Sequence, residues 1–187
     1  MEIKLSQETI SKLHQTLNTN KISLNRIDDK YTLNIGSTNM KTKFGKEMAA
    51  SVASIQLYQE IATDQETLNF DTVFEINYSD LNEKFSYNLK SINNAINAEN
   101  TIDNFIEELK ANNSIRNHSI CDSNFENLKK LKIEDFAFGG FKQKQQSICG
   151  VNRNVTIWIM FILPENKKLN FYVDNTNNKI VKTEEPR

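Results

Sequence analysis

The first amphipathic pattern of the chain is a short helical one. Residues 5–17 read LSQETISKLHQTL, in which Ile10, Leu13 and Leu17 recur at spacings of three and four residues. This spacing places their side chains on one face of an α-helix. Ser6 precedes the pattern, and a serine oxygen suits the N-cap position of a helix. The pattern therefore predicts a short amphipathic helix that begins after Ser6.

A strict alternation of apolar and polar residues follows in residues 21–36, KISLNRIDDKYTLNIG. The polar group Asp28-Asp29-Lys30 interrupts it, and apolar residues occupy every second position on both sides. Alternation at a period of two puts the apolar side chains on one face of a strand. We therefore predict a β-hairpin whose buried face is formed by Ile22, Leu24, Tyr31, Leu33 and Ile35.

Residues 44–62, FGKEMAASVASIQLYQEIA, return to a helical pattern. One helical face would carry the larger apolar residues Phe44, Met48, Val52 and Ile55. A row of small residues runs beside that face at spacings of four, made of Gly45, Ala49 and Ala53. Small side chains in such a row let a neighbouring element approach the helix backbone closely. We predict that this segment is the central helix of the fold.

The next segment alternates again. In residues 68–92 the apolar positions before the turn sequence SDLN are Val73, Phe74, Ile76 and Tyr78, and those after it are Phe85, Tyr87 and Leu89. This pattern predicts a second hairpin. Residues 93–113 then favour a helix, which Thr101 would split in two if it served as an internal cap. A short helix capped by Ser123 is expected over residues 123–131.

Residues 131–185 carry several strand patterns separated by short turn sequences, NRN, PENKK and NTNN. They predict an antiparallel meander, in which Gly139 and Gly140 mark a bulge that lets the sheet curve. Because the helical patterns precede this meander, we predict an α+β fold with helices packed on a curved antiparallel sheet. The expectation is a single domain over residues 1–187, with a helix- and hairpin-rich part at about 1–130.

The longest apolar run, Val155 to Leu163, lies in the second of these strands. It is about nine residues long, roughly half of what a helix needs to cross a membrane, so we predict no membrane span. Its β-branched and aromatic residues favour a strand. Apolar residues at both parities imply that both faces are covered. The cover is a curved sheet closing on itself, a helix from the N-terminal half or a second copy of the chain.

The distribution of charge excludes some classes of partner. Lys and Arg number 23 against 24 Asp and Glu, which gives a formal net charge of -1, and neither sign forms a long block. Nucleic acids and anionic membrane surfaces are normally bound by clustered basic residues. We therefore expect no nucleic-acid partner. The frequent Asn, Lys and Ile residues indicate an AT-rich genome rather than a particular chemistry.

The chain has 2 cysteines, Cys121 and Cys149. This is too few for a disulfide framework, and a zinc site needs several soft ligands at short, fixed spacings. We therefore expect two free thiols in a reducing compartment. The first residues, MEIKLSQETI, contain no basic region leading into an apolar core and so predict no secretion signal. Both observations favour a cytoplasmic protein.

Polar residues that could carry chemistry occur at two places. His118 and Cys121 lie close together in RNHSICD, and a cysteine with a histidine partner can act as a nucleophile. Their spacing matches no cysteine-enzyme signature, and a polar loop is the alternative. Glu134 and Asp135 are neighbours, so in a strand they would point to opposite faces, whereas an acid–base pair must face one substrate. We predict no catalytic residue, metal or cofactor.

Aromatic side chains gather in the C-terminal strands. Rings on a sheet can stack RNA bases, but such sheets carry basic residues and a recognisable motif that this sequence lacks. The rings therefore either pack in the core or line a binding surface. The candidates for binding are Trp158, Phe138, Phe141, Phe171 and Tyr172.

These observations favour a non-enzymatic intracellular module that binds another protein, as an accessory, chaperone-like, immunity-type or assembly-subunit protein, or that self-associates as a homodimer. Three features motivate this hypothesis: the lack of a catalytic constellation, the near-neutral charge, and an apolar strand whose second face needs a cover. The alternative is a curved-sheet pocket protein that binds a small apolar ligand or carries an unrecognised hydrolytic site. In that case Trp158 or Phe138 would line a cavity onto which His118 or Glu134 converges.

Overall fold

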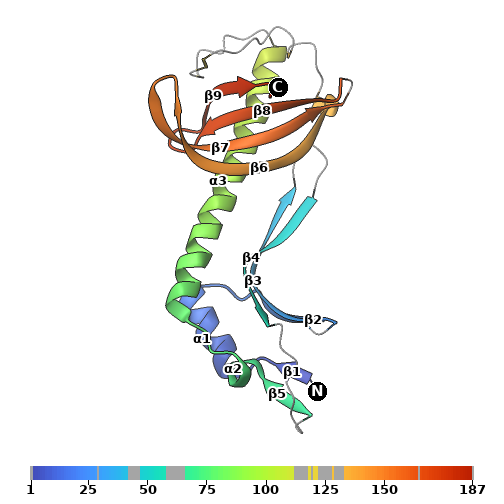
Figure 1. Cartoon of the computed structure of the whole chain (residues 1–187), viewed down its shortest axis with the longest axis vertical. Helices are drawn as coiled ribbons and strands as arrows, with labels where there is room; N and C mark the ends of the chain where they lie inside the picture. The colour runs from blue at the N-terminus through green and yellow to red at the C-terminus, as the bar shows by residue number, and fades with distance from the viewer. Residues whose placement is uncertain are drawn as a thin grey trace. The chain divides into compact units, whose positions relative to one another are not determined.

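The computed structural model describes residues 2–28, 30–41, 47–57, 66–111, 118, 120–121, 128, 133–163 and 165–186, with the side chains of 38–41, 47–50 and 133 left out. The described residues form helices and sheets whose strands pair mainly antiparallel, which confirms the α+β class (Figure 1). The chain divides into two compact units, Met1–Asn39 with Ala49–Lys90, and Met40–Met48 with Ser91–Arg187. That the chain is a single domain stays a prediction.

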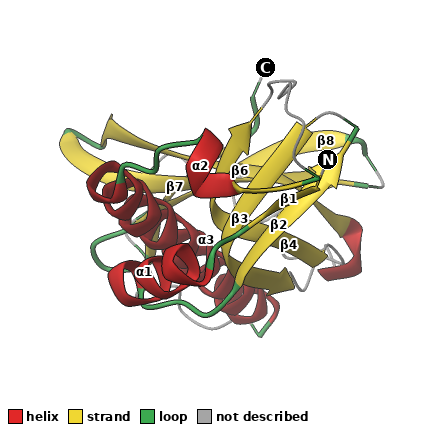
Figure 2. Ribbon diagram, turned by 90° about the horizontal axis from the view of Figure 1, so that it is seen from below, coloured by secondary structure: helices red, strands yellow, loops and turns green. Residues whose placement is uncertain are grey.

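The first unit contains two small sheets and the N-terminal helices (Figure 2). Strand β1 (Glu2–Lys4) pairs in parallel with β5 (Thr67–Asn69). Strands β2 (Ile22–Ile27), β3 (Lys30–Lys41) and β4 (Glu47–Leu57) form a three-stranded sheet in the order β2-β3-β4. Helix α1 (Gln7–Leu17), the short α2 (Phe70–Val73) and the first turns of α3 (Tyr78–Lys110) complete the unit.

Two predicted elements of this unit are confirmed. Helix α1 follows Ser6, whose Oγ accepts a hydrogen bond from the Thr9 N–H at 3.1 Å, and it buries Leu13 and Leu17. The hairpin β2–β3 buries Tyr31, Leu33 and Ile35 on one face, whereas Ile22 and Leu24, also predicted for that face, are half-buried. At Gly36 the backbone has a φ of 68°, and an added Cβ would lie 2.9 Å from the Phe85 ring on α3. Glycine therefore lets β3 approach the helix closely.

The predicted central helix over residues 44–62 is wrong, because residues 47–57 of it form β4. Phe44, Gly45 and residues 58–62 lie outside the described residues. Val52, Ala53 and Leu57 are buried, and β3 supplies a neighbouring strand whose backbone groups pair with those of β4. Helix propensity is a weak preference that such tertiary pairing overrides.

The predicted second hairpin over residues 68–92 is also wrong. Tyr78 begins α3, which follows Asn77, and the Asn77 Oδ1 accepts a hydrogen bond from the Asp80 N–H at 3.2 Å. Leu81 and Phe85, four residues apart, are buried, whereas Tyr87 is 71% exposed. The alternation of Phe85, Tyr87 and Leu89 was short, and the helical spacing of the buried residues determines the structure.

Helix α3 continues without a break to Lys110, so the predicted split at Thr101 is wrong. The Thr101 Oγ1 lies within hydrogen-bond distance of the carbonyl oxygens of Asn97, 2.9 Å away, and Asn178, 3.1 Å away. A threonine hydroxyl that bonds back to the preceding helical turn is compatible with a continuous helix. The helix predicted over residues 123–131 lies outside the described residues apart from Leu128, which is buried.

The second unit contains the predicted antiparallel meander, which is confirmed. Its strands are β6 (Phe136–Ile148), β7 (Val151–Ile162), β8 (Lys167–Asp174) and β9 (Lys179–Glu184), paired in sequence order. The register shifts between Phe138 and Gly140, which confirms the predicted bulge. Figure 1 shows a strongly curved sheet. Residues of α3 including Ile102, Phe105 and Ile106 pack in one core cluster with Trp158 and Phe171 of the sheet.

Candidate functional site

Strand β7 separates two hydrophobic clusters. Trp158, Met160 and Ile162 belong to the cluster that contains α3. Val155 and Ile157 point the other way and pack with Tyr172, Val181 and other apolar residues, against which Cys121 also packs. From Val155 to Trp158 every side chain is fully buried, so the prediction that both faces of this strand are covered is confirmed there. We call the face that carries Val155 and Ile157 the second face.

The second face opens toward the end of β7, so the prediction of complete cover is wrong for this part of the strand. Ile159 is half-buried, Phe161 is 37% exposed, and Leu163, just after the strand, is 59% exposed. Ala137, the register partner of Phe161, is too small to cover it. At Gly139 an added Cβ would lie 2.5 Å from the Phe161 ring. These small β6 residues leave the ring accessible.

A buried polar atom adjoins this apolar surface. Asn170 on β8 is the register partner of Ile159 and is 7% exposed. Its Oδ1 has no hydrogen-bond partner within the described part of the chain. Leaving a buried acceptor unpaired costs about 1–3 kcal/mol. We define the open patch as Ala137, Gly139, Ile159, Phe161, Leu163 and Asn170.

Tyr172 and Glu184 form a fixed polar link beside Asn170. The Tyr172 hydroxyl donates to the Glu184 Oε2 at 2.5 Å, and the Lys182 Nζ lies 2.9 Å from the other carboxylate oxygen. Burial, together with the Glu184 carboxylate, raises the pKa of Tyr172 to about 12. The hydrogen bonds from Tyr172 and Lys182 lower the pKa of Glu184. The polar groups of Tyr172, Lys182 and Glu184 on this part of the second face are therefore paired with one another.

Lysines border the open patch. Lys168 is the register partner of Phe161, and Lys142 is the register partner of Ile157, so both lie on the second face. Both are exposed. The ion pairs seen among the described residues do not include either of them. The rim of the patch therefore offers positive charge that no carboxylate of the described chain neutralises.

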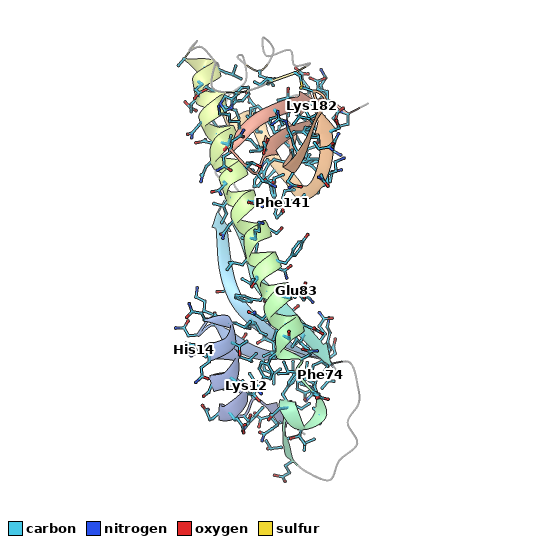
Figure 3. All side chains as sticks on the ribbon, turned by 90° about the vertical axis from the view of Figure 1, so that its left-hand side faces the viewer. Lys12, His14, Phe74, Glu83, Phe141 and Lys182 are labelled. Atoms are coloured by element: carbon cyan, nitrogen blue, oxygen red, sulfur yellow. A yellow bond between two sulfur atoms is a disulfide. The ribbon has the colours of Figure 1, made fainter. Side chains whose placement is uncertain are left out.

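The five aromatic residues predicted as binding candidates lie outside the open patch. Trp158, Phe138 and Phe171 are buried in the cluster with α3, where the Phe138 and Trp158 ring centroids are 4.7 Å apart. Phe141, labelled in Figure 3, is half-buried and stacks on Trp158 at 5.9 Å. Tyr172 is buried on the second face. Sequence reasoning missed Phe161, although it belongs to the same apolar run.

His118 and Cys121 are brought to β9. The His118 Nδ1 accepts a hydrogen bond from the Ile180 N–H at 3.3 Å, and its Nε2 lies 3.4 Å from the Glu108 Oε2. Burial lowers the pKa of His118, while Glu108 acts in the opposite direction. Because the backbone N–H occupies Nδ1 and the neutral ring carries its proton on Nε2, neither nitrogen is free to accept a proton from a substrate.

The prediction of two free thiols is wrong, because Cys121 and Cys149 form a disulfide. Their Cα atoms are 6.4 Å apart, within the range that a disulfide spans. Cys149 lies in the turn after β6, and the Cys121 N–H donates to the Val181 carbonyl on β9 at 3.3 Å. The disulfide therefore joins two segments that are distant in sequence across the second face.

Glu134 and Asp135 lie at the other end of β6. They belong to a 3₁₀ turn, Ile133–Asp135, in which Glu134 is exposed and Asp135 is half-buried. The Asp135 carbonyl accepts a hydrogen bond from the Leu163 N–H at 2.8 Å. Strand β6 is 13 residues long and separates this turn from the disulfide. The four predicted polar residues thus fall into two separate pairs.

Comparison of the chain with family models, curated proteins and solved structures gave no match. Within the described residues, no helix is both long and apolar enough to cross a membrane.

Proposed function

We propose that this chain is a non-enzymatic module that binds another protein through the open patch. The observation that carries the proposal is the exposed apolar surface at the end of β7, where Phe161 is 37% exposed and Leu163 is 59% exposed. Aromatic and apolar side chains that lie together on the surface are typical of the centre of a protein interface. The engaged nitrogens of His118 support the non-enzymatic reading.

The chemistry of the patch specifies the partner. Phe161 and Leu163 favour apolar side chains on the partner. Lys142 and Lys168 favour acidic residues around that apolar centre. A two-fold symmetric dimer through this surface brings the same patch of each copy together. Its lysines would then lie close to those of the second copy, so we propose a different protein as the partner.

The apolar-pocket alternative receives no comparable support. The rings of Trp158, Phe138 and Phe171 pack within the core cluster that contains α3. Protein interiors are close-packed, so rings in such contact leave little room for a ligand between them. A hydrolytic site would also require convergence of the polar candidates, whereas Cys121 is tied to the turn after β6, and Glu134 and Asp135 precede that strand.

The disulfide is informative about the cellular compartment in which the chain works. Disulfides persist in oxidising environments and are rare in the cytosol. We propose that the chain works in an oxidising compartment, instead of the cytoplasm that the cysteine count favoured. Alkylation of the unreduced protein from its native cells tests this: blocked cysteines support the proposal, and full labelling of Cys121 and Cys149 contradicts it.

Surface variants test the binding function. We expect Phe161→Ser to weaken binding of a captured partner by at least about 2 kcal/mol, as for an interface hot spot. Val151→Ser is the matched control, because Val151 is 48% exposed at the other end of the same strand. Gly139→Ala would displace the Phe161 ring and also weaken binding. Equal affinity of all variants, measured by calorimetry, would contradict the proposal.

A further inference from the structure

The first unit carries a hollow of about 410 Å³ on its three-stranded sheet. In the β2–β3 register, Leu24 pairs with Leu33 on one face, and Ser23 pairs with Asn34 on the other. Leu33 is fully buried, whereas Ser23 and Asn34 line the hollow. The hollow therefore lies on the face of the sheet that is turned away from the core.

Amides and hydroxyls line most of this hollow, which we call the amide–hydroxyl pocket. Its side chains of this kind are Asn20, Ser23, Asn25, Asn34, Ser37 and Ser51. The Ser51 Oγ donates to the Asn34 Oδ1 at 2.8 Å, which joins β3 to β4 across the pocket. The Gly36 N–H donates to the Lys21 carbonyl at 2.7 Å and holds the two ends of the hairpin together. Several polar groups are thus held on paired strands.

The charge of the lining limits the ligand class. Among the described residues that line the pocket there is no carboxylate and one ammonium group, that of Lys21, which precedes β2. A polyanion is normally held by several cations, a hard metal ion by carboxylates, and an apolar ligand by an apolar wall. Solvent-facing sheet surfaces are polar by default. In a chain with 25% charged residues, however, the described strand positions that line this pocket carry no charge.

We propose that the amide–hydroxyl pocket binds a neutral, hydroxyl-rich ligand of the oligosaccharide class. A carboxamide presents both donors and an acceptor, and a serine hydroxyl does both with one oxygen. A sugar hydroxyl likewise both donates and accepts hydrogen bonds. A row of amide and hydroxyl side chains can therefore pair with the hydroxyls of the ligand without a charged residue. This site belongs to the first unit and is independent of the open patch.

Side-chain amide signals of the ¹⁵N-labelled full chain test the proposal, with maltotriose and triacetylchitotriose as neutral probes and citrate as an anionic probe. We expect at least one neutral probe to shift the Asn25 and Asn34 signals with a dissociation constant of about 1 mM or below. Asn25→Ala and Asn34→Ala should each weaken this binding roughly tenfold.

The matched control is Asn82→Ala, because Asn82 is exposed on α3 and does not line the pocket. Its binding should equal that of the unchanged chain. Asn25 is exposed, so its variant keeps the test valid if Asn34→Ala fails to fold. The proposal is overturned if neither neutral probe gives a saturable shift, if citrate saturates the same signals, or if Asn25→Ala binds as well as the control.

Discussion

At the scale of the residue, the hydrogen bonds of His118 determine its protonation state. The Ile180 N–H donates to Nδ1, so the ring can keep this bond only while Nδ1 is unprotonated. The neutral ring then carries its proton on Nε2, which faces the Glu108 carboxylate. Burial lowers the pKa of His118 below its ordinary value of 6.5, although Glu108 opposes this shift.

A dependence of stability on pH follows from this pKa. The unfolded chain takes up the His118 proton near pH 6.5, whereas the folded chain takes it up only at lower pH. Between these two values the unfolded state binds more protons, so stability falls as the pH falls. In His118→Asn, the Oδ1 can still accept the Ile180 N–H but does not titrate. Its melting temperature should therefore change less between pH 7.5 and 5 than that of the unchanged chain.

The control for this measurement is His14→Asn, because His14 lies on the exposed side of α1. This variant should retain the pH dependence of the unchanged chain. A His118→Asn profile that coincides with that of His14→Asn would contradict the role assigned to His118.

The Trp158 side chain defines the core at the same scale. It is fully buried and contacts the rings of Phe138 and Phe141. Trp158→Ala should lower the free energy of unfolding by roughly 3–5 kcal/mol, because the large cavity is filled only in part by relaxation. Denaturant titration followed by circular dichroism measures this loss. A near-neutral value would mean that the ring lies at a surface.

Among the helices and strands, the segments predicted correctly are those in which the local sequence pattern and the tertiary packing favour the same structure. Helix α1 has both a cap and a continuous apolar face, and the C-terminal strands have clear turn sequences between them. Residues 44–62 follow a helical spacing and residues 68–92 alternate, yet β4 and α3 form there instead. Asn77 is a suitable N-terminal cap and so was a signal for the start of α3. The alternating residues after Tyr78 favoured a strand instead, and the signal was missed. Pairing with β3 decided the structure of β4, and no local pattern contains that information.

A pair of substitutions distinguishes the helix from the predicted hairpin. In a strand, Phe85 and Tyr87 would share one face and cost about the same when truncated. In α3, Phe85 is buried and Tyr87 is exposed. Phe85→Ala should therefore cost about 3–5 kcal/mol of unfolding free energy, and Tyr87→Ala less than about 1 kcal/mol. Similar losses for both variants would argue against the helix.

The disulfide could not be predicted from two cysteines in the sequence, because only the fold brings them together. It closes a loop with a sequence separation of 28 residues. In the chain-entropy account, such a crosslink stabilises the folded state by about 3.5 kcal/mol. Cys149→Ser should lose about this free energy in denaturant titrations. As a control, a reducing agent should destabilise the unchanged chain but leave Cys149→Ser unaffected, and an equal effect on both would contradict a stabilising disulfide.

For the molecule as a whole, the sequence predicted which strand carries the candidate surface, but it did not predict which residues form that surface. The apolar run of β7 indicated a strand in need of cover on its second face. Whether a given ring is covered depends on its neighbours: Trp158 faces α3, whereas Phe161 adjoins Ala137 and Gly139. The unpaired Asn170 Oδ1 likewise depends on packing that no pattern of the sequence reveals.

Site-specific photo-crosslinking in the native cell shows whether the open patch binds another protein. A photoreactive amino acid replaces Phe161 in one variant and Val151 in another, since both positions are exposed on β7. We predict that position 161 gives a discrete crosslinked complex with one other protein and that position 151 gives none. The absence of a complex from position 161, or the same complexes from both positions, would contradict binding through the open patch.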